Sequence, residues 1–140
     1  MTDVRTDRYR RHEQIDWFSQ DAVRSARIVV VGAGAKPFIA YTIASVTDHG
    51  AGDEVIYPVP GFPIYESQIV ANGAVPVPIY LRESRNFAFD PAELAAKIGP
   101  KTRLVILNPP HNPPGGILSS ADLDGIAEIL SQHPNVWVFA

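Results

Sequence analysis

Residues 103–116 read RLVILNPPHNPPGG, an apolar run rich in branched side chains followed by a loop of proline, asparagine and glycine. A continuous apolar run of this length is typical of a strand covered on both faces. The prolines that follow lack the N–H donor that a sheet requires, so the strand must end before them. The same order, an apolar run and then an unusual loop, recurs in RIVVVGAGAKP at 27–37 and DEVIYPVPGFP at 53–63.

Apolar runs alternate with helical patterns along the chain. Asp90 before Pro91 predicts a helix start, and Ser119 or Ser120 is a second N-cap candidate with Asp122 in the first turn. We expect strands at 27–32, 53–58, 74–80, 103–108 and 135–140, and helices near 19–25, 36–48, 62–72, 91–98 and 119–132. This alternation predicts a single α/β domain over residues 1–140, with three α/β/α layers around a mainly parallel sheet of about five strands.

The loops GAGAKP, PVPGFP and NPPHNPPGG each follow a predicted strand. In open parallel sheets, ligands bind beyond the carboxyl ends of the strands. The three loops therefore predict a binding site at that edge, and the alternative is that they are only tight turns.

Composition excludes several classes of function. The chain has 140 residues, 46% hydrophobic and 19% charged, and a net charge of -3, so we expect a globular domain without a nucleic-acid partner. There is no cysteine, signal-like start or long apolar run, so we expect a cytoplasmic protein without a membrane segment. The four histidines are scattered without ligand spacing, so no metal site is expected.

The loop GAGAKP joins a predicted strand to a predicted helix, where free N–H groups favour a phosphate. Gly32 and Gly34 fit half of a dinucleotide-binding fingerprint, but Pro37 stands at its third glycine. The loop is not a P-loop either, because no Lys-Ser/Thr pair follows at the right spacing. A phosphate site and a plain strand–helix turn both remain open on these residues.

From about residue 31 to residue 140, the sequence resembles the class I/II aminotransferases of the aspartate aminotransferase family. The matching stretches are GAGAKPFIAYTIASVTDHGAGDEVIYPVPGFPIYES, FAFDPAELAAKIGPKTRLVILNPPHNPPGG and DLDGIAEIL. These enzymes are of fold-type I and use pyridoxal 5′-phosphate (PLP). The resemblance implies part of their Rossmann-like large domain and PLP as the small-molecule cofactor.

The resemblance also implies roles for five residues. Gly34, Ala35 and Lys36 match the turn that holds the cofactor phosphate, Phe62 matches the aromatic residue that stacks on the pyridine ring, and Asn112 matches the asparagine that binds the phenolic oxygen. Pro114 departs from the family, which usually has threonine there. The structural alternatives are a solvated Lys36, a core Phe62 and a turn-capping Asn112.

The lysines of the sequence are Lys36, Lys97 and Lys101. None stands where the family has the lysine that bonds the cofactor, which lies beyond residue 140 together with the aspartate of the pyridine nitrogen and the arginine of the substrate. We therefore expect no catalytic residue here and no transamination by this chain alone.

The first segment, DRYRRHEQIDWFSQDAVRSARIVVVGAGA, resembles the start of ubiquitin-activating-type adenylyltransferases over about residues 8–35. Arg8, Tyr9, Arg10 and Arg11 carry that likeness. It implies an adenylyltransferase-like start fused to an aminotransferase segment over 36–140, hence a chimera. A divergent natural N-terminus is the alternative.

Three functions follow as hypotheses. The first is an aminotransferase-derived chain with residual PLP binding, the second an ATP-binding module, and the third a folded chimera without biochemical function. Since the family's sheet has more strands than this chain, we also expect an exposed sheet edge through which copies associate.

Overall fold

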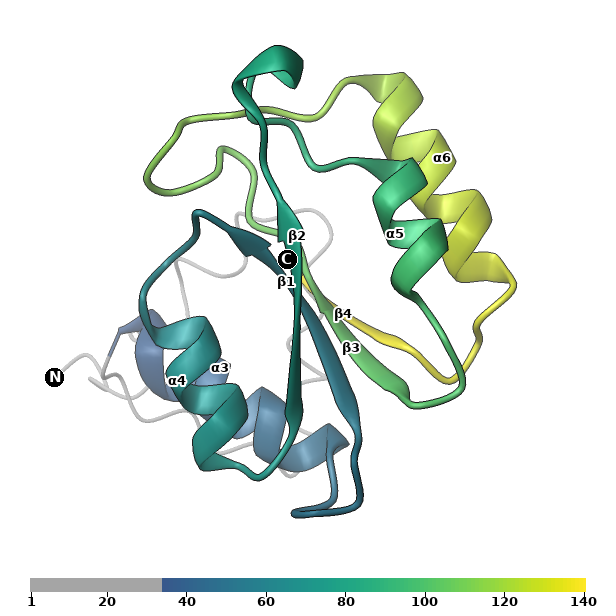
Figure 1. The fold of residues 1–140 in the computed structure, drawn as a ribbon. Coiled ribbons are helices and arrows are strands. Elements are labelled where there is room, and N and C mark those ends of the chain that lie inside the picture. Colours follow the sequence, from purple (N-terminus) through teal and green to yellow (C-terminus); the bar gives the residue numbers. More distant parts are fainter. Residues whose placement is uncertain (1–33) are drawn as a thin grey trace, which may run out of the picture. The chain divides into compact units, whose positions relative to one another are not determined.

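The computed structural model describes residues 34–140, and Figure 1 shows their arrangement. Helices and strands alternate as the sequence predicts, and each predicted boundary in this range lies within two residues of the observed one. The elements are α3 (Ala35–Val46), β1 (Glu54–Val59), α4 (Ile64–Ala71), β2 (Val75–Tyr80), η2 (Glu83–Arg85), α5 (Pro91–Lys97), β3 (Thr102–Ile106), α6 (Ser120–Ser131) and β4 (Trp137–Phe139).

The four strands form one sheet in the order β2-β1-β3-β4, and every neighbouring pair is parallel. Ile56 at the middle of β1 lies between Val77 of β2 and Val105 of β3. This confirms the predicted α/β class with a parallel sheet. The predicted strand at 27–32 and helix at 19–25 lie outside the described residues, and the prediction of a single domain over residues 1–140 stays a prediction.

Two apolar cores cover the two faces of the sheet, which confirms the three layers (Figure 1). On one face α3 and α4 bury Ile43 and Ile69 against β1 and β3. On the other, α5 and α6 bury Leu94 and Ile126 against the opposite sides of the same strands. Burial of such side chains contributes about 1.5–3 kcal/mol each, which holds the helices on the sheet.

Two helix starts are capped by the residues that the sequence indicates. The carboxylate of Asp90 accepts a hydrogen bond from the Ala92 N–H at 3.0 Å, and Pro91 is the first residue of α5. At α6 the N-cap is Ser119, whose hydroxyl accepts from the Asp122 N–H at 3.1 Å while the Asp122 carboxylate accepts from the Ser119 N–H at 3.0 Å. This capping box decides for Ser119 over Ser120.

The inner and outer strands differ in exposure. Four consecutive residues of β1 and four of the five residues of β3 are buried, as expected for strands covered on both faces. β4 lies at the end of the described sheet, and its Trp137 and Val138 are exposed. Association of copies through such an edge stays a prediction. None of the helices within 34–140 has the length and apolar character needed to cross a bilayer.

Candidate cofactor site

The loops that follow β1 and β3 leave the same edge of the sheet, because the two strands are parallel neighbours (Figure 1). They are the PVPGFP and NPPHNPPGG loops of the sequence. The predicted site residues Phe62 and Asn112 lie in these loops. The structure therefore places both at the carboxyl end of the sheet, the edge at which open parallel sheets generally bind ligands.

The third predicted element is the start of α3. Gly34 is its N-cap with φ 77°, a backbone conformation that residues other than glycine rarely adopt. Gly34, Ala35 and Lys36 are exposed, and a Cβ built on Gly34 would have no atom within 4 Å. Among the described residues, no side chain caps this helix, and its first turn contains no acidic residue. No hydrogen bond described within 34–140 therefore engages the N–H groups at this helix start.

This open start distinguishes α3 from the other described α-helices. α5 and α6 are capped by Asp90 and Ser119, and each has an acidic residue in the first turn. α4 has no side-chain cap but carries Glu66 in its first turn. Among the α-helices within 34–140, α3 is the one that has neither a described side-chain cap nor an acidic residue in its first turn, where both would interact with the N–H groups and the positive end of the dipole.

Phe62 is partly buried beside the core of the α3–α4 face. Its ring meets that of Tyr65 edge to face, with centroids 5.9 Å apart and an interplanar angle of 76°. Such a contact fixes the orientation of an aromatic ring without burying both of its faces. Phe62 thus partly fits the structural alternative of a core residue, and its remaining exposure is compatible with stacking on a ligand.

Asn112 is exposed in a loop whose backbone is closed by two hydrogen bonds. The His111 N–H donates to the Gly116 carbonyl at 2.8 Å, and the Gly115 N–H donates to the His111 carbonyl at 2.6 Å. The turn therefore forms with Pro114 in the place where the resemblance expects threonine. Within residues 34–140, no described hydrogen bond involves the Asn112 side chain, so its amide is available to a ligand.

A second segment supports this loop from the α5–α6 side. Gly116 packs on the backbone of Phe87 so closely that a Cβ would overlap the Phe87 carbonyl and lie 2.9 Å from that of Asn86. Asn86 and Phe87 have positive φ values of 51° and 56°. The imidazole of His111 is buried and stacks on Phe89, with centroids 6.3 Å apart and planes 21° apart.

Tyr65 connects the two loops. Its side chain is buried, which raises the pKa of its hydroxyl, and an interaction with the Asn108 side chain partly offsets that rise. Nearby on β1, burial and then the carboxylate of Glu66 raise the pKa of Tyr57 to about 12. Both phenols therefore stay protonated at neutral pH and act as neutral hydrogen-bonding groups.

The structure thus places Phe62 and the Asn112 loop at the same edge of the sheet, where Tyr65 interacts with Asn108. Within 34–140, no hydrogen bond joins Gly34–Lys36, Phe62 and Asn112 directly. Sequence reasoning missed Tyr65, Asn108 and His111. Tyr65 and Asn108 each stand within four residues of a predicted residue, but no sequence pattern indicates their mutual contact.

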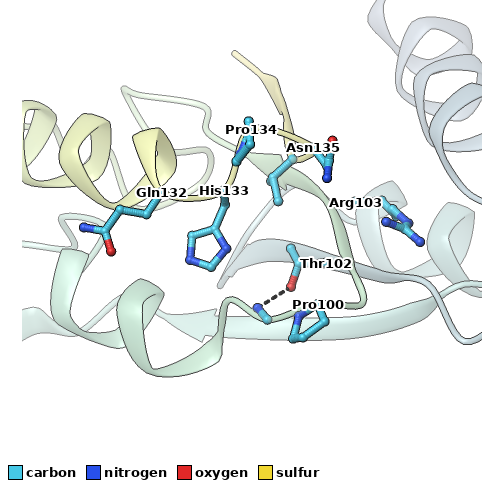
Figure 2. Close-up of a pocket in the computed structure, with 9 residues that line it drawn as sticks. Pro100, Thr102, Arg103, Gln132, His133, Pro134 and Asn135 are labelled. Carbon is cyan, nitrogen blue, oxygen red and sulfur yellow. Dashed lines mark hydrogen bonds between the residues drawn. The ribbon is translucent and has the colours of Figure 1, made fainter.

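A cavity of about 150 Å³ lies at the opposite, amino end of the strands. Figure 2 shows it between the turn before β3, with Pro100 and Thr102, and the turn before β4, with His133 and Pro134. The Thr102 hydroxyl accepts from the Gly99 N–H at 2.9 Å, and Arg103 is paired with Asp53 at 2.9 Å. Thr102 and Arg103 thus already serve the fold, and we assign the cavity no function.

Comparison with known protein families distinguishes between the two resemblances, to aminotransferases and to adenylyltransferases. The model of the family "Aminotransferase class I and II" matches residues 8–140. The chain belongs to the class I and II aminotransferases. The match already includes the stretch at about residues 8–35 that resembles adenylyltransferases. No finding supports the predicted fusion with that second family. The residues concerned, about 8–35, lie almost entirely outside the described part of the structure.

Relatives agree with this assignment. The chain is 33% identical over 112 residues to the aspartate/prephenate aminotransferase of Cereibacter sphaeroides, covering 80% of this chain and 28% of that protein. It is 36% identical over 119 residues to kynurenine–oxoglutarate transaminase 3 of Mus musculus, covering 79% and 26%. The aminotransferase segment therefore spans about a quarter of the length of these relatives.

Solved structures show the same fold. The aspartate aminotransferase from Rhizobium meliloti is 37% identical with a TM-score of 0.69, over 75% of this chain and 26% of that one. The N-succinyldiaminopimelate aminotransferase from Mycobacterium tuberculosis is 35% identical with a TM-score of 0.67, over 75% and 27%. The four-stranded sheet and its helices thus match part of an aminotransferase.

Proposed function

We propose that this chain is the segment of a class I/II aminotransferase that holds PLP, with the start of α3, Phe62 and Asn112 as the binding groups. The observation that carries the proposal is the open start of α3 beside Gly34. It supplies N–H groups, a positive helix end and Lys36, and the first turn of α3 contains no acidic residue. These are the groups that a phosphate monoester requires.

The ring of the cofactor would lie over the loops after β1 and β3. The partly exposed Phe62 offers a flat apolar face, and Tyr65 holds that face by the edge-to-face contact at 5.9 Å. Asn112 offers an amide donor for the phenolic oxygen. Tyr65, which follows the first loop, interacts with Asn108 at the start of the second, so the ring and the amide would act on one ligand.

PLP, once bound, supplies an electron sink for chemistry at the α-carbon of an amino acid. The residues here contribute binding and orientation. Lys36 is exposed at the helix start, Lys101 is exposed at the far end of β3, and Lys97 donates to Glu93 at 2.6 Å. None of the three is desolvated near the site, as a lysine that bonds the cofactor must be. We therefore propose reversible binding without turnover for these 140 residues alone.

Thermal unfolding of the purified chain tests the proposal. The ligand should be pyridoxamine 5′-phosphate, which lacks the aldehyde that reacts with any surface lysine. A ligand at 100 times its Kd stabilises the folded state by about 2.7 kcal/mol, so the midpoint should rise by several degrees. Pyridoxamine without the phosphate should give a much smaller rise.

ATP provides the second comparison. A rise with pyridoxamine 5′-phosphate and none with ATP would support the cofactor site. A rise with ATP alone would contradict it and favour the nucleotide-binding alternative. A cooperative transition that neither ligand moves would mean that the fold persists without a binding function.

A further inference from the structure

His111 is the residue before Asn112, and its side chain is unlike any other polar group in the described structure. The residue is 2% exposed, and both ring nitrogens are buried without a hydrogen-bond partner. A neutral imidazole in such a place costs free energy because its polar atoms have lost water. A protonated imidazole would cost far more, since a buried charge needs a partner.

Among residues 34–140, the surroundings of His111 offer no such partner. One face of the imidazole stacks on Phe89, which is itself fully buried. The loop 108–116 carries no acidic or basic residue apart from His111. On the flanking segments, Arg85 pairs with Asp90 at 3.3 Å and with Asp122 at 3.2 Å, so these charges are engaged with one another. Burial is accordingly the one cause that lowers the pKa of His111.

The backbone of the same residue closes the loop. The N–H and the carbonyl of His111 make the two hydrogen bonds, at 2.8 and 2.6 Å, that hold Gly116 and Gly115. The imidazole thus fixes the loop to Phe89 from one side, and the backbone fixes the turn that presents Asn112. A backbone displacement that accompanies expulsion of the ring would disturb both hydrogen bonds and the position of the adjacent Asn112.

The geometry points to His111 as a positioning residue that holds Asn112 in place only while its imidazole is neutral. Protonation at mildly acidic pH favours a state in which the ring reaches water and the loop leaves Phe89. The ligand affinity of the site then falls with pH. This inference rests on the proposed cofactor site for its effect on affinity, but the effect on the loop is independent of any ligand.

The first experiment uses no ligand. Urea unfolding is measured between pH 5 and pH 8 for the wild-type chain, for His111→Phe, which keeps an aromatic ring against Phe89, and for His111→Leu as a second apolar variant. In the unfolded chain a histidine has a pKa near 6.5, and burial lowers the pKa of His111 in the folded state. The wild-type unfolding constant should therefore rise, relative to either variant, by up to about tenfold for each pH unit below 6.5. His49→Gln, at an exposed histidine, should keep the wild-type profile.

The second readout is the backbone amide signal of Asn112 by NMR, followed over the same pH range. The Asn112 signal should shift with pH in the wild-type chain and should not shift in either variant. Identical pH profiles of stability for wild type and variants, or an Asn112 signal that moves equally in all of them, would overturn the inference.

Titration with pyridoxamine 5′-phosphate at pH 8 and pH 5.5 separates this inference from the proposed function. Absence of binding at pH 8 contradicts the cofactor site, while the two readouts above still decide the role of His111. If the ligand binds at pH 8, the ratio of wild-type Kd to His111→Phe Kd should grow several-fold at pH 5.5. An unchanged ratio contradicts the coupling to Asn112.

Discussion

Gly116 lies directly against the backbone of Phe87, and the space between them has no room for a side chain. This contact joins the Asn112 loop to the segment before α5. Gly116→Ala should therefore destabilise the chain by about 1–3 kcal/mol, because the added methyl group overlaps the Phe87 carbonyl and forces the backbones apart. Urea unfolding measures the difference.

Gly99→Ala is the matched control, because a Cβ at Gly99 would meet no atom within 4 Å. That variant should stay within about 0.5 kcal/mol of the parent. Equal stabilities for the two variants would show that the loop does not dock on Phe87.

The capping box of α6 allows a test between neighbouring serines. Ser119→Ala removes the acceptor of the Asp122 N–H, which is 3.1 Å away, and should cost about 1 kcal/mol. Ser120→Ala removes no capping bond and should be neutral or slightly stabilising, since alanine favours helix. Thermal unfolding of the two variants measures this, and a larger loss for Ser120→Ala would contradict the assigned cap.

Asp53 should make the fold sensitive to acid. Its carboxylate accepts from the Asp48 N–H at 2.8 Å and from Arg103 at 2.9 Å, and these bonds, against an opposing effect of burial, hold its pKa below the usual 3.8. The folded state then binds fewer protons than the unfolded chain. The stabilisation is complete above about pH 4 and is lost as the pH falls through the folded pKa.

Asp53→Asn should therefore be less stable than the parent at pH 7 and should lose less stability between pH 5 and pH 3. The control is Asp124→Asn, at an exposed position on α6, whose profile should follow that of the parent. Denaturation at several pH values provides the comparison. If stability falls with pH in Asp53→Asn as it does in the parent, then Asp53 does not contribute to the acid sensitivity.

The sequence predicts the described fold closely because its signals are local. Asp90 before Pro91 marks a helix start through a single hydrogen bond, and RLVILN ends where proline removes a donor. These features depend on neighbours in the chain. They can therefore be recognised in the sequence without knowledge of the tertiary structure.

The site is only partly predictable for the opposite reason. Family resemblance indicates Phe62 and Asn112, yet the contact between Tyr65 and Asn108 joins residues 43 positions apart, and no local pattern encodes it. The burial of His111 depends likewise on Phe89 in another segment. The likeness of residues 8–35 to adenylyltransferases shows the converse: a local strand and glycine turn is shared by many phosphate-binding folds, so it cannot identify one family.

Phe62 should contribute to ligand affinity through stacking. Phe62→Leu keeps an apolar side chain beside the core but removes the flat ring, so Kd for pyridoxamine 5′-phosphate should rise roughly twofold to tenfold. Tyr41→Leu replaces an aromatic ring that is 72% exposed on α3 and should leave Kd unchanged. Calorimetric titration gives both values, and equal values for the two variants would argue that Phe62 serves only the core.

NMR of the ¹⁵N-labelled chain shows whether the carboxyl edge of the sheet holds the cofactor. Adding pyridoxamine 5′-phosphate should move the amide signals of Gly34, Lys36, Phe62 and Asn112. The signals of Gly99 and His133, at the cavity on the amino side, should stay in place. Shifts confined to the amino side, or no shift at any ligand concentration, would mean that the cofactor does not bind at the carboxyl edge.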